Sequence, residues 1–560
     1  MRKMKRTRTN WKKAAVGTVL ALSLSLPVNV MANPVPAKVT VEAALSELVP
    51  LRVVAESIGA EVAWNQETYQ AEIRRGDQQL TVTIGEHKAI MNGTEVQMEK
   101  AAQLINELTM VPLEAIEQAF QADLDWDEED GLHINKEDLV SLSGFIMNQL
   151  FSGNYSEIPD LISDPLKKAL TPEVIQIMGM QVIGIYGAPE KLITVQQDDN
   201  AVHHNVKLTY MTANQIPLEI TLRYNQDRLL NDLFIPYMGA AGYEKPSYED
   251  PDAYTEKEVV IGEAPFLLPG TLTLPQGEGP FPVVVLVHGS GMNDRDEAVG
   301  AYKPFRDIAV GLAAQDVAVL RYEKRTREYP YQSSAIPNFT VQHETVEDAL
   351  HAVKLLQSED KIDPERIYLA GHSQGAMLVP RMIEADEAGS VAGAAVISGP
   401  STPLEDILLW QFESQLKYAK ENNVPEEQIA QLEQQVALYK EDLKAIKDPE
   451  VQTEPENFNF GNFAWWKDFS NYYGGELAKD QTVPLIIMQG DNDSQVPAKE
   501  LDGWKEALSA RNDVAYKLYP RMNHFLIEVD QPSTGLEYAV PGNVSKQLID
   551  DLAEWIKKQN

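Results

Sequence analysis

The chain has 560 residues, of which 44% are hydrophobic and none is cysteine, and 84 acidic side chains against 48 basic ones give a formal net charge of −36. Such an acidic chain argues against nucleic acid and anionic membranes as partners, because both bind basic patches. Without cysteine the chain forms no disulfide bonds, so stability has to come from buried cores, and the length is enough for about three domains.

Residues 1–32 have the composition of a secretory signal peptide. Seven basic residues and no acidic one are followed by an apolar run from Ala14 and by small residues that place the expected cleavage at Ala32. An uncleaved anchor is the alternative, but two serines and a proline interrupt a run already short for a membrane span. The segment therefore predicts an extracellular protein, secreted or associated with the cell wall, that makes no membrane contact once the signal is removed.

Residues 38–135 are predicted to form a first domain that contains an internal repeat. The segment 49–65, VPLRVVAESIGAEVAWN, recurs at 111–127 as VPLEAIEQAFQADLDWD. Each copy predicts a proline in the first turn of an amphipathic helix, and then a strand that ends at a tryptophan. Alternating residues at 71–74 and 80–84 predict two strands between the copies.

The first domain resembles the copper amine oxidase N-terminal-like domain of surface and exported bacterial proteins. Its two histidines, His87 and His133, do not have the spacing of a metal-ligand pair, so the name does not imply copper here. We interpret the domain as a small binding or spacing module, with contact to the cell wall as a hypothesis.

Residues 136–240 are predicted to form a second domain of the α+β class, similar to small cystatin-like or nuclear-transport-factor-like domains. Helices are expected over 139–151 and 172–180, and strands over 191–195, 202–211 and 216–225.

Two histidines stand side by side in this domain. His203 and His204 fall in an alternating strand, so their rings face opposite sides and do not hold one metal ion together. Residues 241–256, rich in Pro, Tyr, Asp and Glu, are then expected to be a linker.

Residues 257–560 show strand and helix patterns in alternation. Two antiparallel strands are expected first, over 258–266 and 270–274. Apolar runs that predict buried strands follow at 282–287, 317–322, 366–370, 392–398, 484–490 and 514–520. This alternation predicts an α/β fold with a doubly wound, mostly parallel sheet and right-handed crossovers.

The sequence Gly371-His-Ser373-Gln-Gly375 stands between a strand and a helix. A strand that turns directly into a helix crowds its neighbours, and the two glycines leave room for a strained turn that exposes the serine hydroxyl. The segment has the form of a nucleophile elbow with Ser373 as the nucleophile. Five residues alone do not exclude a structural turn, so the assignment depends on an acid and a base further along the chain.

An acid and then a histidine follow Ser373 along the chain, which is the order expected for the catalytic partners of a nucleophile elbow. One buried strand opens into Asp491-Asn-Asp493, and the next opens into a loop with His524. In a parallel sheet both loops reach the same carboxyl edge as the elbow. We expect Asp493 rather than Asp491 to orient His524, because a loop tip reaches an adjacent ring more readily than a strand end does. Ser373, Asp493 and His524 are thus the predicted catalytic residues.

An earlier loop, His288-Gly-Ser290-Gly, is expected to complete the site. The backbone N–H groups of Ser290 and of Gln374, the residue after the nucleophile, are the predicted oxyanion-hole donors. His288 and His372 flank these turns, and we expect them to support the loops rather than to transfer protons. We predict neither a metal ion nor a cofactor.

With these motifs, residues 257–560 resemble bacterial α/β-hydrolases of the dienelactone hydrolase and esterase type. The matching motifs, in order, are His288-Gly-Ser-Gly, Gly-His-Ser373-Gln-Gly, Gly490-Asp-Asn-Asp493 and Asn523-His524. The resemblance implies the α/β-hydrolase fold and serine-hydrolase chemistry, but no particular substrate. Ala376 departs from it, since many relatives have a second glycine there, which concerns helix packing more than chemistry.

A long insertion, residues 399–481, separates two of the predicted strands and exceeds ordinary loop length. Its first half is helical and charged, and its second half is aromatic. Such an insertion caps the active site in many hydrolases of this fold. An accessory helical pair packed away from the site is the alternative.

Three functions fit the sequence. The main prediction is an extracellular serine esterase that acts on small-molecule carboxylic esters. A prolyl-oligopeptidase-type peptidase shares the fold and the order of the catalytic residues, but the residues ahead of 257 lack the repeats of a propeller domain. A non-catalytic cell-wall-binding protein is the third, and it is disfavoured because every position of the triad is filled.

Overall fold

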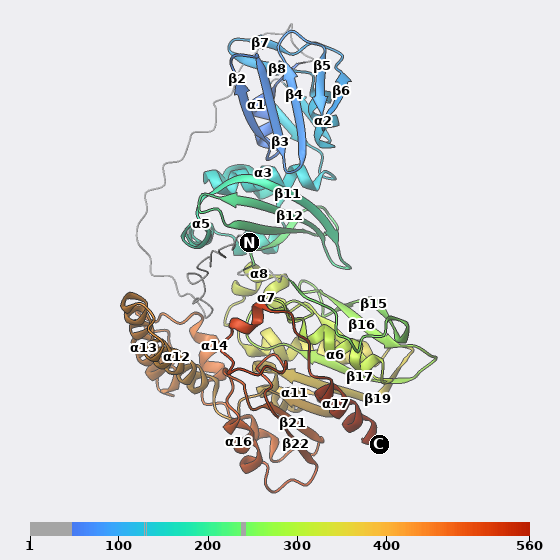
Figure 1. Ribbon diagram of the computed structural model, residues 1–560, viewed down its shortest axis with the longest axis vertical. Helices are drawn as coiled ribbons and strands as arrows, with labels where there is room; N and C mark the ends of the chain where they lie inside the picture. The colour runs from blue at the N-terminus through green and yellow to red at the C-terminus, as the bar shows by residue number, and fades with distance from the viewer. Residues whose placement is uncertain (1–47, 128, 130, 237–241, 560) are drawn as a thin grey trace, which may run out of the picture.

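The computed structural model describes residues 48–127, 129, 131–236 and 242–559. The predicted signal peptide and residues 38–47 lie outside this range. Three units are stacked along the long axis of the molecule, with the first and second domains, here called the front domains, above a C-terminal domain that begins at residue 254 (Figure 1). Within the described residues, no helix combines the length and apolar character needed to cross a bilayer.

The first domain confirms the repeated unit of helix and strand. Pro50 and Pro112 stand directly before helices α1 and α2, and strands β2 and β9 carry the two tryptophans. The intervening chain forms a five-stranded antiparallel sheet, β2–β3–β4–β5–β6, beside a small sheet β1–β8–β7 and a hairpin β9–β10. The bounds are α1 (Leu51–Ser57), α2 (Leu113–Phe120), β1 (Val49–Pro50), β2 (Glu61–Asn65), β3 (Gln70–Arg75), β4 (Gln78–Thr83), β5 (Lys88–Met91), β6 (Thr94–Gln97), β7 (Gln103–Ile105), β8 (Leu108–Val111), β9 (Leu124–Asp127) and β10 (Gly131–Ile134).

The second domain packs helices against a four-stranded antiparallel sheet, β11–β12–β13–β14. The structure differs from the sequence prediction in its additional elements, the short helix α4 and the short strand β14, and in the length of β11 and of α5, which continues to Tyr186. Val182 and Tyr186 are buried in the core, and this packing extends the helix past Gly179 despite the low helix propensity of glycine. The bounds are α3 (Leu139–Ser152), α4 (Asp164–Ala169), α5 (Pro172–Tyr186), β11 (Pro189–Asp199), β12 (His204–Thr212), β13 (Pro217–Tyr224) and β14 (Leu230–Phe234).

An eight-stranded sheet organises the C-terminal domain, in the order β15–β16–β18–β17–β19–β20–β21–β22. Strand β16 is antiparallel to both neighbours and all later pairs are parallel, which confirms the doubly wound, mostly parallel sheet. The first strand begins at Tyr254, inside the predicted linker, and ends at Ile261 rather than at 266. The bounds are β15 (Tyr254–Ile261), β16 (Leu268–Pro275), β17 (Phe281–Val287), β18 (Ala318–Tyr322), β19 (Ile362–His372), β20 (Val391–Ile397), β21 (Leu485–Gly490) and β22 (Val514–Tyr519).

Helices cover both faces of this sheet, and strand β17 shows the consequence for the sequence. Val283, Val285 and Val287 face a core shared with α9, whereas Val284 and Leu286 face a core shared with α6 and α17. A strand buried on both faces needs apolar residues at every position, which explains the continuous apolar runs. The helices outside the insertion are α6 (Pro304–Ala313), α7 (Arg325–Glu328), α8 (Pro330–Ser334), α9 (Glu347–Leu356), α10 (Gln374–Met377), α11 (Val379–Ala385), α16 (Lys499–Ala507) and α17 (Lys546–Lys558).

The insertion between β20 and β21 has two unlike parts. Helices α12 (Leu404–Glu421) and α13 (Glu426–Lys447) form a hairpin that projects to one side of the C-terminal domain, and α14 lies closer to the sheet (Figure 1). The second part contains α14 (Phe463–Phe469) and α15 (Gly474–Ala478). It buries aromatic side chains in a core that it shares with the sheet.

Residues 243–249, in the predicted linker, pack against the C-terminal domain instead of forming a free spacer. The hydroxyl of Tyr243 donates to Oδ1 of Asp307 at 2.7 Å, and that of Tyr248 donates to the backbone oxygen of Val544 at 2.9 Å.

A buried polar cluster joins the second domain to the C-terminal domain. The carboxylate of Glu328, at the end of α7, lies 2.6 Å from Nδ1 of His203 and 3.2 Å from Nε of Arg223, and all three side chains are buried. Nearby, Asp232 of β14 accepts the backbone N–H of Gln332 at 3.1 Å. Specific hydrogen bonds and ion pairs therefore fix these two domains against each other.

Candidate active site

The chain turns sharply at the carboxyl end of β19, where it enters α10. Ser373 has φ 53° and ψ −116°, a strained conformation, and is partly exposed. A Cβ atom at Gly371 would overlap the carbonyl oxygen of Gly375, and one at Gly375 would lie 2.5 Å from the carbonyl oxygen of His288. Space therefore requires both glycines, and the turn has the geometry of a nucleophile elbow.

Asp493 and His524 meet in the loops that follow β21 and β22. Nδ1 of His524 lies 2.8 Å from Oδ2 of Asp493, and the two side chains are almost wholly buried. The other oxygen of Asp493 accepts two backbone N–H groups of the following turn, at 2.8 and 2.7 Å, which hold the carboxylate in place. Because a carboxylate only accepts hydrogen bonds, Nδ1 carries a proton and Nε2 is left as an acceptor.

Asp491 has a different environment. It is exposed, and its Oδ1 accepts the backbone N–H of Arg521 at 2.6 Å, so it ties the end of β21 to the turn after β22. Of the two candidate acids, the structure brings only Asp493 to the imidazole of His524.

His372, directly before Ser373, connects the elbow to His524. Its Nε2 donates to the backbone oxygen of His524 at 2.9 Å, and the two ring centres lie 4.8 Å apart. Nδ1 of His372 lies 2.9 Å from Oε2 of Glu297, an ion-pair contact whose angle is not that of a hydrogen bond. Among the described residues, no hydrogen bond joins Ser373 Oγ to His524, so His372 is the link between the two loops.

The surroundings of His372 favour the protonated form of its ring. Burial lowers the pKa of His372, but contacts with Glu297 and with the carbonyl of His524 outweigh burial and raise that pKa above its usual value. The two groups that face the ring nitrogens, the carboxylate of Glu297 and the backbone oxygen of His524, are both acceptors, and this arrangement favours a protonated ring beside Ser373.

The loop after β17 runs against the nucleophile. A Cβ atom at Gly289 would lie 3.0 Å from the Cβ of Ser373, a distance that only glycine permits without a shift. Oγ of Ser290 donates to Oε1 of Gln374 at 2.8 Å. The structure thus brings together the two residues whose backbone N–H groups are the predicted oxyanion donors.

Glu297 is a residue near the site that the sequence analysis did not single out. It is 3% exposed, and besides its pairing with His372 it accepts the backbone N–H of Gly289 at 2.6 Å. It lies in an irregular loop, where no periodicity marks buried positions. His288 supports the same loop: its Nε2 lies 3.0 Å from the backbone oxygen of Asp294, and burial lowers the pKa of its ring to about 4.

The insertion touches the site from two sides. Nε2 of Gln411, in α12, donates to the backbone oxygen of Gln495 in the loop of Asp493 at 2.9 Å. Nε1 of Trp465, in α14, donates to Oε2 of Glu344 at 2.6 Å. These contacts favour a cap over a helical pair packed away from the site, and we call residues 399–481 the cap insertion.

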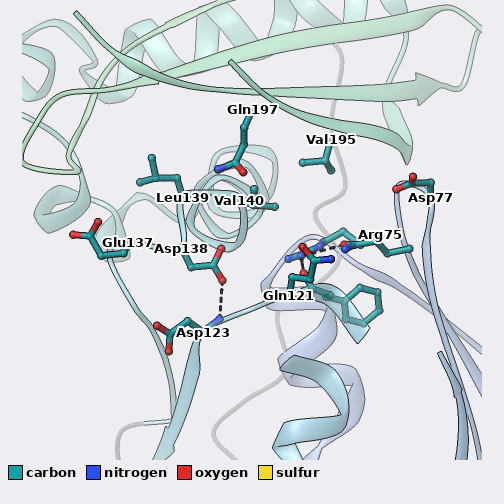
Figure 2. A pocket seen from close by; sticks show the side chains of 12 residues that line it. Arg75, Asp77, Gln121, Asp123, Glu137, Asp138, Leu139, Val140, Val195 and Gln197 are labelled. Carbon is teal, nitrogen blue, oxygen red and sulfur yellow. Dashed lines mark hydrogen bonds between the residues drawn. The ribbon is translucent and has the colours of Figure 1, made fainter. Parts of the chain in front are cut away.

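A cavity of about 430 Å³ lies between the two front domains and is separate from this site (Figure 2). None of the predicted site residues lines it. Arg75, in its wall, is 2% exposed and donates to Oγ of Ser141 at 3.0 Å and to the backbone oxygen of Phe120. Across the described ranges, no group of three or more His, Asp or Glu side chains is placed to hold a metal ion.

Comparison with known proteins gives matches in both parts of the chain. Residues 32–134 match the family described as Copper amine oxidase N-terminal domain, and residues 279–531 match the family described as Serine aminopeptidase, S33. The chain is similar to Esterase EstD of Thermotoga maritima, with 37% identity over 327 residues that cover 58% of this chain and 73% of that protein.

Two further similarities are either shorter or lower in sequence identity. A protease inhibitor of Brevibacillus choshinensis is 31% identical over 117 residues, which are 20% of this chain and 36% of that protein. The solved structure of Est1E from Butyrivibrio proteoclasticus has a TM-score of 0.34 at 14% identity, over 54% of this chain and 98% of that one.

Proposed function

Because this chain belongs to the α/β-hydrolase esterases and is a carboxylic ester hydrolase, we propose that it acts through an acyl-enzyme intermediate on Ser373. The observation that carries the proposal is the 2.8 Å contact between His524 Nδ1 and Asp493 Oδ2, in a loop that His372 holds beside the nucleophile. This contact leaves Nε2 of His524 as the only basic atom of its ring.

In the proposed reaction, Oγ of Ser373 attacks the ester carbonyl while Nε2 of His524 takes the hydroxyl proton. Asp493 holds the imidazole in the required tautomer and stabilises the imidazolium that forms. His524 then gives the proton to the departing alkoxide, and the alcohol leaves. A water molecule, deprotonated by His524, attacks the acyl-enzyme, and the carboxylic acid is released as the proton returns to Ser373.

The negative charge that develops on the carbonyl oxygen requires fixed donors. We assign this role to the backbone N–H groups of Gln374 and Ser290, which flank Ser373 from two loops. Preorganised donors of this kind lower the barrier most, because they do not have to reorient as the charge appears.

Small and medium esters suit a site that a cap insertion partly covers. We also propose that the protein works outside the cell, where the signal-like segment 1–32 would direct it. The first domain is then available for contact with the cell wall.

A peptidase is the second candidate, and the match of residues 279–531 to the serine aminopeptidase family favours it. The front domains, as far as they are described, are two small units of helices and strands and form no propeller. One assay separates the candidates: p-nitrophenyl acetate and butyrate beside a panel of aminoacyl p-nitroanilides, for wild type and Ser373→Ala. Faster cleavage of the anilides, or ester cleavage that survives in Ser373→Ala, would overturn the proposal.

A further inference from the structure

A buried ion pair lies behind the loop that carries Ser290. Lys324, just after β18, is 2% exposed, and its Nζ donates to the backbone oxygen of Gly289 at 2.7 Å. The same Nζ lies 2.7 Å from Oε1 of Glu344, which is 7% exposed. Nδ2 of Asn293 donates to the same backbone oxygen at 3.1 Å. A lysine charge is unfavourable in a protein interior unless it is paired, so Glu344 is what allows Lys324 to reach this loop.

Glu344 is the centre of a hydrogen-bond network. It lies in a π-helical turn directly before α9. Its second oxygen, Oε2, accepts Nε1 of Trp465 at 2.6 Å and Nε2 of Gln374 at 3.3 Å. One carboxylate therefore contacts a buried lysine, the residue after the nucleophile, and the cap insertion.

The network contacts the peptide group that joins Gly289 to Ser290. The carbonyl of Gly289 and the N–H of Ser290 belong to the same peptide; Lys324 holds the oxygen of this group, and Gln374 accepts the hydroxyl of Ser290. A charged donor on the carbonyl oxygen fixes the peptide plane and draws electron density toward that oxygen, which makes the N–H a stronger donor. This N–H is one of the two proposed oxyanion donors.

We infer that Lys324 and Glu344 are positioning residues for the oxyanion hole, and that the indole of Trp465 makes their placement depend on the cap insertion. The inference rests on the proposed function, because it needs the N–H of Ser290 to face the oxyanion. Well-packed apolar residues stabilise an interior at least as well as a buried ion pair does, so stability alone does not account for the two charges. The cap insertion thus acts on the transition state as well as covering the substrate.

The first experiment compares Trp465→Phe with Trp466→Phe in the full chain. Trp466 is a matched control, because it is the next residue and its Nε1 donates at 2.7 Å to the backbone oxygen of Phe460, within the cap insertion. With p-nitrophenyl butyrate, Trp465→Phe should lower kcat by about tenfold and leave KM within about twofold of wild type. The reason is that the N–H of Ser290, one of the two proposed oxyanion donors, is then held less firmly in place. Trp466→Phe should leave kcat within about twofold of wild type.

A second readout separates positioning from mere packing. An alkylboronic acid forms a tetrahedral, negatively charged adduct with an active serine and so resembles the transition state. Its inhibition constant should rise in Trp465→Phe by about the same factor as kcat falls. A fall in kcat with an unchanged inhibition constant, or a change in KM alone, would overturn the inference.

The double variant Lys324→Met with Glu344→Gln removes both charges together and leaves no unpaired ion. It should fold, as circular dichroism would report, and lose about 10²-fold in kcat; wild-type turnover would overturn the inference. If it does not fold, the comparison of Trp465 with Trp466 decides.

The failure of this inference and that of the proposed function are distinguishable. Activity retained in Ser373→Ala would remove the serine mechanism itself. An inactive Ser373→Ala together with a fully active Trp465→Phe would remove only the role of the network.

Discussion

His372 donates from Nε2 to the backbone oxygen of His524 at 2.9 Å, so the residue before the proposed nucleophile fixes the loop that carries the proposed general base. Because Nδ1 of the same ring faces Glu297, the loop of the base, the elbow and the oxyanion loop are joined by one buried charge pair. A raised pKa makes His372 a poor acceptor for a proton from Ser373, which supports the proposed role of His524 as the base.

The Glu297–His372 pair predicts a pH window for stability. Burial raises the pKa of Glu297, but His372 and the other contacts outweigh burial and lower that pKa below 4.5, whereas the pKa of His372 is raised above 6.5. The acid contributes stability above 4.5 that is lost as the pH falls through its folded pKa. The histidine contributes stability that is complete below 6.5 and is lost as the pH rises through its folded pKa.

Denaturant unfolding of wild type and Glu297→Gln, from about pH 4 to about pH 9, checks this window. The difference in the free energy of unfolding should be largest between 4.5 and 6.5 and should shrink at higher pH. A difference that does not shrink as the pH rises above 6.5 would show that the pair does not stabilise the protonated form of His372.

Ser373→Ala should lose about 10⁴-fold or more in kcat for p-nitrophenyl butyrate, because only the oxyanion donors and substrate binding remain. The fold should survive, since alanine fits the same turn and the required space comes from Gly371 and Gly375. Steady-state kinetics with a circular dichroism control measures both. Turnover within about tenfold of wild type would remove the serine mechanism.

Arg223→Ala should weaken the contact between the second domain and the C-terminal domain and lower the free energy of unfolding. Burial raises the pKa of Glu328, but Arg223 and His203 outweigh burial and lower that pKa to about 2. Its stabilising effect is therefore present above 4.5 and is lost as the pH falls toward 2. Removing Arg223 leaves a buried carboxylate short of a partner, which should cost about 3 kcal/mol.

Arg228→Ala is the matched control for this prediction. Arg228 pairs with Glu137 at 2.8 Å on the surface of the same domain, where water screens the two charges and the pair adds little to stability. Thermal unfolding should separate the two variants clearly. At 25 °C both should keep the wild-type kcat, because every proposed site residue lies in the C-terminal domain. Equal shifts in Tm would contradict a buried docking cluster.

The sequence was informative where backbone geometry demands particular residues. The elbow needs Gly371 and Gly375 for space, and a strand covered on both faces needs apolar residues throughout, so the sheet and the turn at Ser373 could be predicted. That the loops of Asp493 and His524 meet also follows from the sequence, because both come after strands that end at the same edge of a parallel sheet.

The partners of buried charges could not be predicted in the same way. Lys324 and Glu297 lie in irregular segments and Glu344 lies in a short π-helical turn, and each is buried only because a residue distant in the chain pairs with it. Likewise, the predicted linker contains Tyr243 and Tyr248, whose burial depends on α6 and on the start of α17 rather than on local pattern. Long-range pairing of this kind leaves no periodicity in the sequence.

The last prediction distinguishes the two acids that follow β21. Asp493 contacts Nδ1 of His524 at 2.8 Å, and in Asp493→Asn the amide group can donate to Nδ1 and favour the wrong tautomer. The base is then protonated on the atom that should face Ser373, so kcat should fall on the order of 10⁴-fold.

Asp491→Asn is the matched control, because the same change is made two residues away. The side chain of Asp491 accepts the backbone N–H of Arg521, and an asparagine oxygen can accept the same hydrogen bond, so kcat should stay within about threefold of wild type. Both variants should be measured with p-nitrophenyl butyrate at the same pH, about 8. Because each substitution removes one negative charge near the same edge of the sheet, a general electrostatic effect would lower both rates alike. A large loss confined to Asp491→Asn would instead make Asp491 the orienting acid and would contradict the geometry around His524.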